Sequence, residues 1–162
     1  NIPELTELRR VIGRGLQQRA VISHNLRIHS AADSISTARD GAALVNSLDR
    51  ALRGTEFSRL ELLVQKDLAG ALESVAVMTP DASGYLLSVS FEHLLNPEHQ
   101  VEIRVPIFDG DQCVGRLSLF RSTEGERLYT DVRLVARRLV PSIVEALRRI
   151  HSGQAGRLSL EG

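Results

Sequence analysis

The sequence predicts an α+β domain in which helices at both ends of the chain flank about five strands. Near each end, apolar residues recur at intervals of three and four, which is the period of an amphipathic helix. Between Gly54 and Tyr129, short β-prone runs are separated by turn residues instead. Because the strands follow one another and the helices are segregated, this order favours α+β over a βαβ arrangement.

Two helices are expected before Gly54. The first spans Pro3 to about Ser30, and Ala31–Ser36 is expected to be a polar break. Thr37 then starts the second helix as N-cap, with Asp40 in the capping-box position, and Gly54 ends it. The apolar positions of the first helix are expected to form one stripe: Leu5, Leu8, Val11, Ile12, Leu16, Ile22, Leu26 and Ile28.

Five segments are expected to be strands, namely Phe57–Val64, Ser74–Thr79, Tyr85–Phe91, Val101–Phe108 and Cys113–Phe120. Asp109-Gly110 between the last two is a typical hairpin turn. Strict alternation in the fourth segment puts its branched aliphatic residues on one face of the sheet. The opposite face of that strand then holds Glu102, Arg104, Pro106 and Phe108.

The last helix is expected to start at Thr130 as N-cap and to end at Gly153. Pro141 lies inside it and should kink or split it. Three parts follow from these elements. Residues 1–34 form an N-terminal linker or dimerisation helix, 35–152 form the folded domain, and 153–162 form a flexible tail.

Composition excludes several classes of protein. The 162 residues are 43% apolar, which suffices for one core and argues against disorder. No apolar run is long enough to span a bilayer, and the start lacks a signal-peptide layout. The single cysteine, Cys113, excludes an internal disulfide and a multi-cysteine zinc site. A reducing, cytoplasmic compartment is therefore expected.

The net charge of zero conceals a segregation of charge. Residues 1–54 carry eight arginines against five acids, and 127–152 carry six against two, whereas 55–126 carry five basic residues against twelve acids. The basic ends and acidic middle cancel. Nucleic acid is not expected as a partner, because binding it relies on a net or clustered positive charge.

The segment Val105–Leu119 (VPIFDGDQCVGRLSL) resembles a GAF domain, as does the later Tyr129-Thr130-Asp131. The resemblance covers about residues 35–151. It implies a central antiparallel sheet of five or six strands, with the N- and C-terminal helices packed on one face. Many GAF domains pair through those helices, and some bind small ligands such as cyclic nucleotides or bilins. The signature residues for those ligands are missing here, so no cofactor is expected.

A weaker resemblance concerns the first 60 residues. The Arg-rich helix 9–29 and the stretch Thr37–Phe57 are similar to the cytosolic C-terminal extension of some bacterial polyprenyl-phosphate sugar-1-phosphate transferases. The catalytic motifs of those membrane enzymes lie in a part that this sequence does not contain. This resemblance implies an alternative function, a ligand-free cytosolic scaffold domain that meets the membrane only through other parts of its parent chain.

No catalytic or metal site is expected. The rim of a small-molecule pocket is predicted at Tyr85, Phe91, His93 and His99, because the two histidines and their neighbouring acids are the most chemically suggestive cluster. The alternative interpretations are an exposed polar loop and, third, a small enzyme that uses the same histidines. A histidine pair six residues apart without a third ligand does not make a metal site.

The leading hypothesis is a non-catalytic GAF-type sensory or regulatory module within a longer bacterial protein, since the chain begins at Asn1 without a methionine. It is expected to form a homodimer through its terminal helices. The residues predicted for that interface are Leu5, Leu8, Ile12, Leu139, Ile143 and Ile150.

Overall fold

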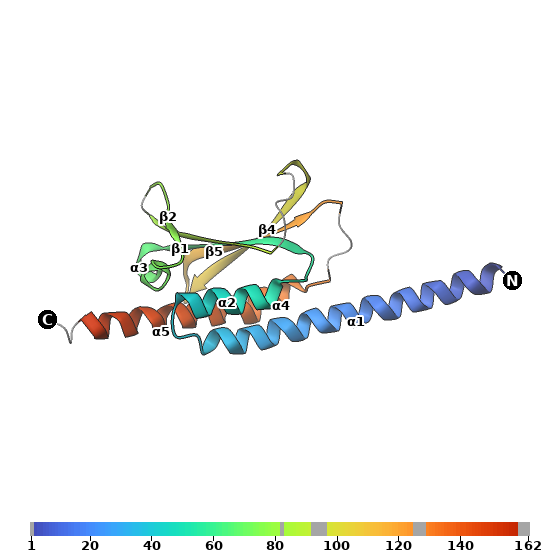
Figure 1. The fold of residues 1–162 in the computed structure, drawn as a ribbon, viewed down its shortest axis with the longest axis horizontal. Coiled ribbons are helices and arrows are strands. Elements are labelled where there is room, and N and C mark those ends of the chain that lie inside the picture. Colours follow the sequence, from blue (N-terminus) through green and yellow to red (C-terminus); the bar gives the residue numbers. More distant parts are fainter. Residues whose placement is uncertain (1, 82, 92–96, 125–128, 159–162) are drawn as a thin grey trace.

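The computed structural model describes residues 2–81, 83–91, 97–124 and 129–158. It contains a five-stranded antiparallel sheet with its long helices on one side (Figure 1). The α+β class and the antiparallel sheet predicted from the sequence are confirmed. The two termini lie at opposite ends of the long axis of the molecule (Figure 1).

The first helix is longer than predicted. Helix α1 runs from Ile2 to Ser36 without a break, and α2 spans Gly41–Leu52. The expected break at Ala31–Ser36 is wrong, because Ala31, Ala32 and Ile35 in it are buried in the core and hold the segment helical. The N-cap of α2 is Asp40 and not Thr37, since the Asp40 carboxylate accepts the Ala43 N–H at 2.8 Å.

The sheet has the order β2-β3-β1-β5-β4. Its strands are β1 (Phe57–Gln65), β2 (Val77–Met78), β3 (Gly84–Ser90), β4 (Gln100–Asp109) and β5 (Gln112–Ser122). The predicted strand 74–79 is reduced to two residues, because α3 (Lys66–Ala69) and the 3-10 turn η1 (Gly70–Leu72) bury Ala69, Ala71 and Leu72 before it. A second 3-10 turn, η2 (Pro97–His99), precedes β4.

The last helix is split, as Pro141 predicts. It consists of α4 (Val132–Leu134), a π-helical turn η3 (Val135–Leu139) and α5 (Val140–Leu158). The wider π turn directly precedes Pro141, which has no N–H to donate, and the Ser142 hydroxyl donates to the Arg138 carbonyl at 2.9 Å. The N-cap is Asp131 and not Thr130. Gly153 does not end the helix, which continues to Leu158.

The core lies between the sheet and the helices. Alternate residues of the central strands face the helices and are buried, among them Leu60, Leu62, Leu87, Leu117 and Leu119. From the helix side, α1, α2, η3 and α5 contribute Ile28, Ile35, Leu44, Leu48, Leu139, Ile143 and Leu147. No helix in the described part of the chain covers the opposite face, which we call the open face (Figure 1).

A buried carboxylate joins α1 to the rest of the domain. Glu56, whose side chain is 8% exposed, accepts hydrogen bonds from the backbone N–H groups of Tyr129 and Thr130 at 3.1 and 2.7 Å. Its other oxygen accepts the Thr130 hydroxyl at 3.0 Å and lies 3.3 Å from Nδ1 of His24 on α1. This network fixes the middle of α1 against the segment before α4.

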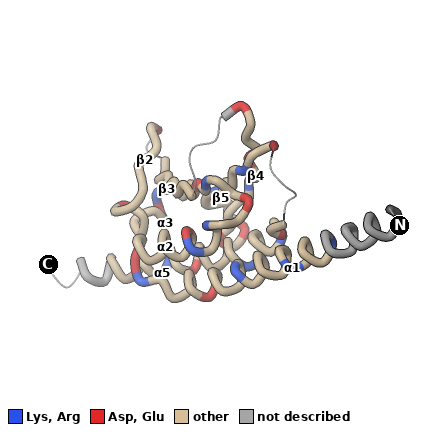
Figure 2. The backbone as a smooth tube through the Cα atoms, turned by 45° about the vertical axis from the view of Figure 1, so that its right-hand side comes forward, with Lys and Arg blue, Asp and Glu red and all other residues tan. Residues whose placement is uncertain are grey.

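The C-terminal end of α1 is held by α5. The Arg149 guanidinium donates to the carbonyl oxygens of Ser36, the last residue of α1, and Ala38, two residues beyond it. A carbonyl at the end of a helix has no acceptor role within that helix, so Arg149 supplies the donor. Basic residues are otherwise interspersed with acidic ones along the helices (Figure 2). None of the helices in the described part of the chain combines the length and apolar content that crossing a bilayer requires.

Candidate functional site

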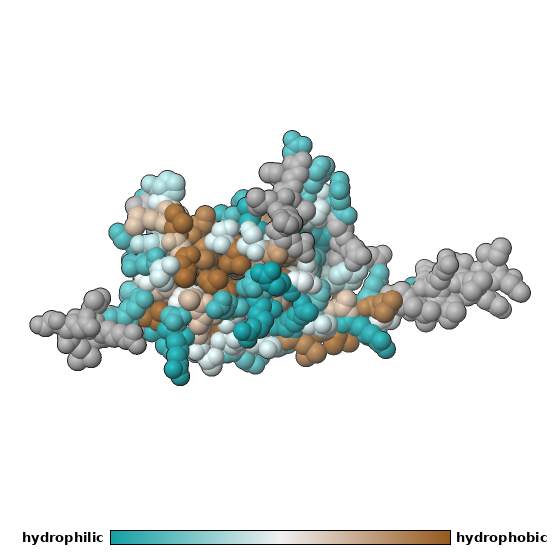
Figure 3. Space-filling view, in the orientation of Figure 1, coloured by the Kyte–Doolittle hydropathy of each residue, from teal (hydrophilic) through white to brown (hydrophobic). Residues whose placement is uncertain are grey.

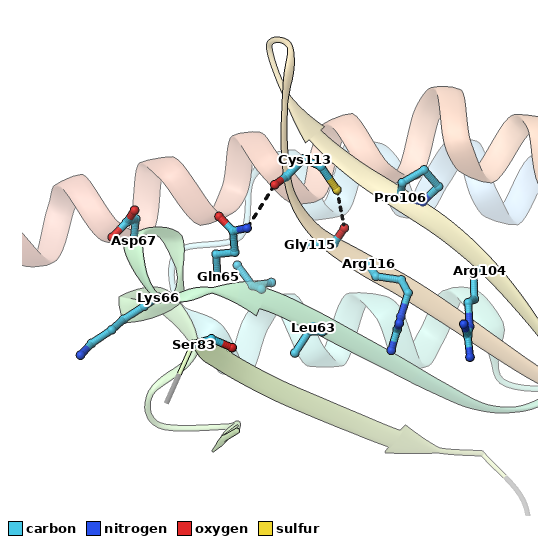
Figure 4. A pocket seen from close by; sticks show the side chains of 12 residues that line it. Leu63, Gln65, Lys66, Asp67, Ser83, Arg104, Pro106, Cys113, Gly115 and Arg116 are labelled. Carbon is cyan, nitrogen blue, oxygen red and sulfur yellow. Dashed lines mark hydrogen bonds between the residues drawn. The ribbon is translucent and has the colours of Figure 1, made fainter. Parts of the chain in front are cut away.

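The open face of the sheet carries a groove of about 770 Å³. Its walls come from β1, β4 and β5, together with the start of α3 (Figure 4). Leu63, Arg104, Pro106 and Arg116 line it along the strands, and Lys66 lies at its α3 end. A volume of this size is within the range usual for small-molecule sites, about 300–1,000 Å³.

Strand register sets the order of these side chains. Arg116 of β5 is the cross-strand partner of Leu63 on β1 and of Pro106 on β4, so a cation lies between two apolar residues in one row. In the next row, Ser118 of β5 lies between Glu61 and Arg104. The alternation predicted for 101–108 is therefore confirmed, with Arg104 and Pro106 on the open face.

Most charges on the open face are paired. Arg104 donates to the Glu102 carboxylate at 2.8 Å, and Arg59 lies 3.6 Å from Glu61 and stacks over the Phe120 ring at 4.1 Å. The hydrogen bond from Arg104, a second one from Ser118 and the nearby Arg116 charge lower the pKa of Glu102 from 4.5 to about 2.

This carboxylate predicts a pH dependence of stability. The folded-state pKa of Glu102, about 2, is below its ordinary value of 4.5, so its contribution is complete above pH 4.5 and is lost as the pH falls toward 2. Glu102→Gln should therefore remove about 1 kcal/mol at neutral pH, allowing for solvent screening, and flatten the acid limb of the stability profile. Urea unfolding at several pH values measures this. The exposed Glu73→Gln serves as control, and an unchanged acid limb in Glu102→Gln would refute the assignment.

Cys113 lies at the hairpin end of the groove. Its thiol is exposed and contacts the Gly115 carbonyl oxygen at 3.5 Å, while the Gln65 amide donates to the Cys113 carbonyl at 3.2 Å (Figure 4). The exposure follows from its position on the outer strand pair, next to the turn at Gly110.

The residues predicted for a pocket rim are not brought together in this groove. Tyr85 and Phe91 pack against the core, and Phe91 is 7% exposed. His99 is exposed on η2, with Nδ1 3.7 Å from a Glu124 carboxylate oxygen. His93 lies outside the described residues. Among the described residues between 84 and 100, only Gly84 lines the groove.

A second candidate surface lies on α1, on the side away from the core. Leu16, Ile22 and Leu26 are 60%, 52% and 64% exposed. Figure 3 shows hydrophobic side chains at the surface along this part of the helix. The described apolar residues of α1 thus lie on two faces of the helix: Ile28, Ala31 and Ile35 pack into the core, while Leu16, Ile22 and Leu26 point to solvent.

The residues predicted for a dimer interface divide into two groups. Leu5, Leu8 and Ile12 are in the helical part of α1, but their side chains lie outside the described residues. Leu139, Ile143 and Ile150 are 0%, 0% and 4% exposed in the core of the single chain, where a second copy does not reach them. They are core residues, and an interface on the helix layer has to use other side chains.

Two further observations concern metal binding and similarity to known proteins. Among the described residues, no three His, Cys, Asp or Glu side chains converge in a way that would hold a metal ion. No family model, curated protein or solved structure matches this chain.

Proposed function

We propose that this chain is a non-catalytic regulatory module that forms a homodimer through the exposed face of α1. The observation that carries the proposal is the apolar stripe at Leu16, Ile22 and Leu26, which no part of the described chain covers. The GAF resemblance supports it, because pairing through terminal helices is common in that family. A cytoplasmic location is part of the same proposal, since the only cysteine is an exposed free thiol.

The stripe extends toward the start of α1. At 100° per residue, Leu5, Leu8, Ile12, Leu16, Ile22 and Leu26 fall within an arc of about 120° on one side of this continuous helix. The core-facing residues fall on the opposite side. A single helix projecting into water is marginal by itself, and exposed apolar patches usually mark interaction sites. This half of α1 therefore needs a partner.

A second copy is the partner that fits. The stripe covers about 22 residues, or about 33 Å of helix, and ends where Ser30 and Asp33 replace apolar residues on the same face. The spacing is three or four residues except between Leu16 and Ile22, where it is six and Arg19 lies on the same face. A helix with such a stripe can pair with a second copy of itself. Dimerisation would shift the equilibrium between arrangements of α1, and the domain would respond through the His24–Glu56 and Arg149 contacts.

Sedimentation of the double variant Ile22→Gln/Leu26→Gln tests the proposal. The wild-type chain should sediment as a dimer and the double variant as a monomer, because two apolar side chains leave the interface. Its thermal unfolding midpoint, measured on the monomer, should stay close to that of a dilute wild-type sample, since both positions are more than half exposed.

Arg14→Gln is the matched control, because Arg14 is exposed on α1 outside the stripe. It should leave the dimer intact. A wild-type chain that remains monomeric at high concentration, or a double variant that remains dimeric, would contradict the proposal.

A further inference from the structure

Within the described residues, Arg116 is a cation without an ion-pair or hydrogen-bond partner. It is half-buried on the open face, and its Nε atom is inaccessible to water and has no hydrogen-bond partner among those residues. The Glu102 carboxylate, whose pKa the Arg116 charge lowers, accepts its hydrogen bonds from Arg104 and Ser118 instead. A buried donor left unsatisfied costs about 1–3 kcal/mol, so such a group points to a missing acceptor.

We propose that the groove binds a small organic anion. A carboxylate or phosphate group would accept hydrogen bonds from Arg116 and lie beside Arg104, which extends from the adjacent strand in the same direction (Figure 4). The planar guanidinium is suited to bind either group with two parallel hydrogen bonds. This inference goes beyond the proposed dimer and does not rest on it, because the groove and α1 lie on opposite sides of the sheet.

The balance of charge favours an anion. Lys66, Arg104 and Arg116 line the groove, against Asp67 as the acid among the lining residues. Glu102 at the border offsets Arg104, and Glu61 on the same face is held near Arg59. Arg116 therefore interacts with the Glu102 charge only at a distance and forms no direct ion pair within the described residues. An anion placed there would also reduce the repulsion between the two neighbouring arginines.

The floor of the groove favours a planar apolar body on the ligand. Leu63 and Pro106 flank Arg116 in the same row, and Gly84 and Gly115 also line the groove. A ring lying on Leu63 and Pro106 would bring its anionic substituent to Arg116. The class of ligand is thus an aromatic or similarly flat carboxylate or phosphate ester.

The proposal can be tested by titrating the isotope-labelled chain with benzoate and with phenyl phosphate. Amide chemical shifts measured by NMR report the binding. Both anions should shift amides along β1, β4 and β5 around the groove, and the tighter of the two identifies the preferred head group. Benzamide, the neutral counterpart of benzoate, should shift them far less. Arg116→Gln should weaken benzoate binding by at least about tenfold, while Arg39→Gln, at an exposed position outside the groove, should not.

Leu63→Glu provides an independent variant. It places a carboxylate directly across the strand pair from Arg116 and so supplies the missing acceptor from within the chain. This variant should unfold at the same or a higher temperature than the wild type and should not bind benzoate. Absence of groove shifts with both anions, equal shifts with benzamide, or unchanged affinity in Arg116→Gln would overturn the proposal. Repeating the titration on the Ile22→Gln/Leu26→Gln variant separates failure of the groove from failure of the dimer.

Discussion

Replacing Glu56 by alanine should lower the free energy of unfolding by about 3 kcal/mol, which is among the largest effects expected of a single substitution in this chain. The change leaves two backbone N–H groups and the Thr130 hydroxyl without their acceptor in a buried site, and it removes the partner of His24. Thr130 itself is 2% exposed, so water does not replace the carboxylate without rearrangement.

Urea unfolding monitored by circular dichroism measures this effect. Glu61→Ala is the matched control. Glu56 directly precedes β1 and Glu61 is on it, but Glu61 lies on the open face in a looser ion pair with Arg59. It should cost less than about 1 kcal/mol. Glu56→Gln, which keeps one carbonyl oxygen, should fall between the two. If Glu56→Ala were as stable as Glu61→Ala, the hydrogen bonds around Glu56 would contribute little to the free energy of unfolding.

The same substitution, glycine to alanine, should have opposite effects at two positions. At Gly115 a Cβ atom would collide with the Leu63 carbonyl oxygen of β1, so one of two paired strands has to move. Overpacking of this kind costs about 1–3 kcal/mol. At Gly153, inside α5, a Cβ meets nothing within 4 Å, and alanine is the better helix former by about 1 kcal/mol.

Thermal and urea unfolding of each variant, Gly115→Ala and Gly153→Ala, measure its change in stability relative to wild type. The first should be less stable and the second slightly more stable. If Gly115→Ala were neutral, the close approach of β5 to β1 would be wrong. If Gly153→Ala were destabilising, α5 would end before Gly153, as the sequence pattern predicts.

The predictions from sequence were good where one local signal decides the structure. Alternation fixed both faces of β4, and the Asp109-Gly110 turn gave the β4–β5 hairpin. Local sequence signals gave the wrong secondary structure where burial of apolar side chains in the core determines it. Ala31, Ala32 and Ile35 hold α1 helical through a polar stretch, and helical turns occupy 66–72, where a strand-rich region was expected.

The candidate sites were less predictable, because each depends on a relation between distant segments. Arg116 lies between Leu63 and Pro106 because β5 pairs with both β1 and β4, and the pairing of β5 with the distant β1 cannot be read from either segment alone. The predicted interface included the core residues Leu139, Ile143 and Ile150, because an apolar stripe on a helix looks the same in the sequence whether it packs within the chain or against a second one.

The opposed faces of α1 divide one helix between two cooperative units. From about His24 onward, the helix is part of the domain core, and Arg149 closes its last turn, so its backbone opens only when the whole domain unfolds. Among the described residues, no comparable hydrogen bond or ion pair supports the turns between Arg14 and Ser23, and we expect these turns to open locally in a monomer. Dimerisation would join these turns to the globally protected unit, making the length of rigid helix a function of protein concentration.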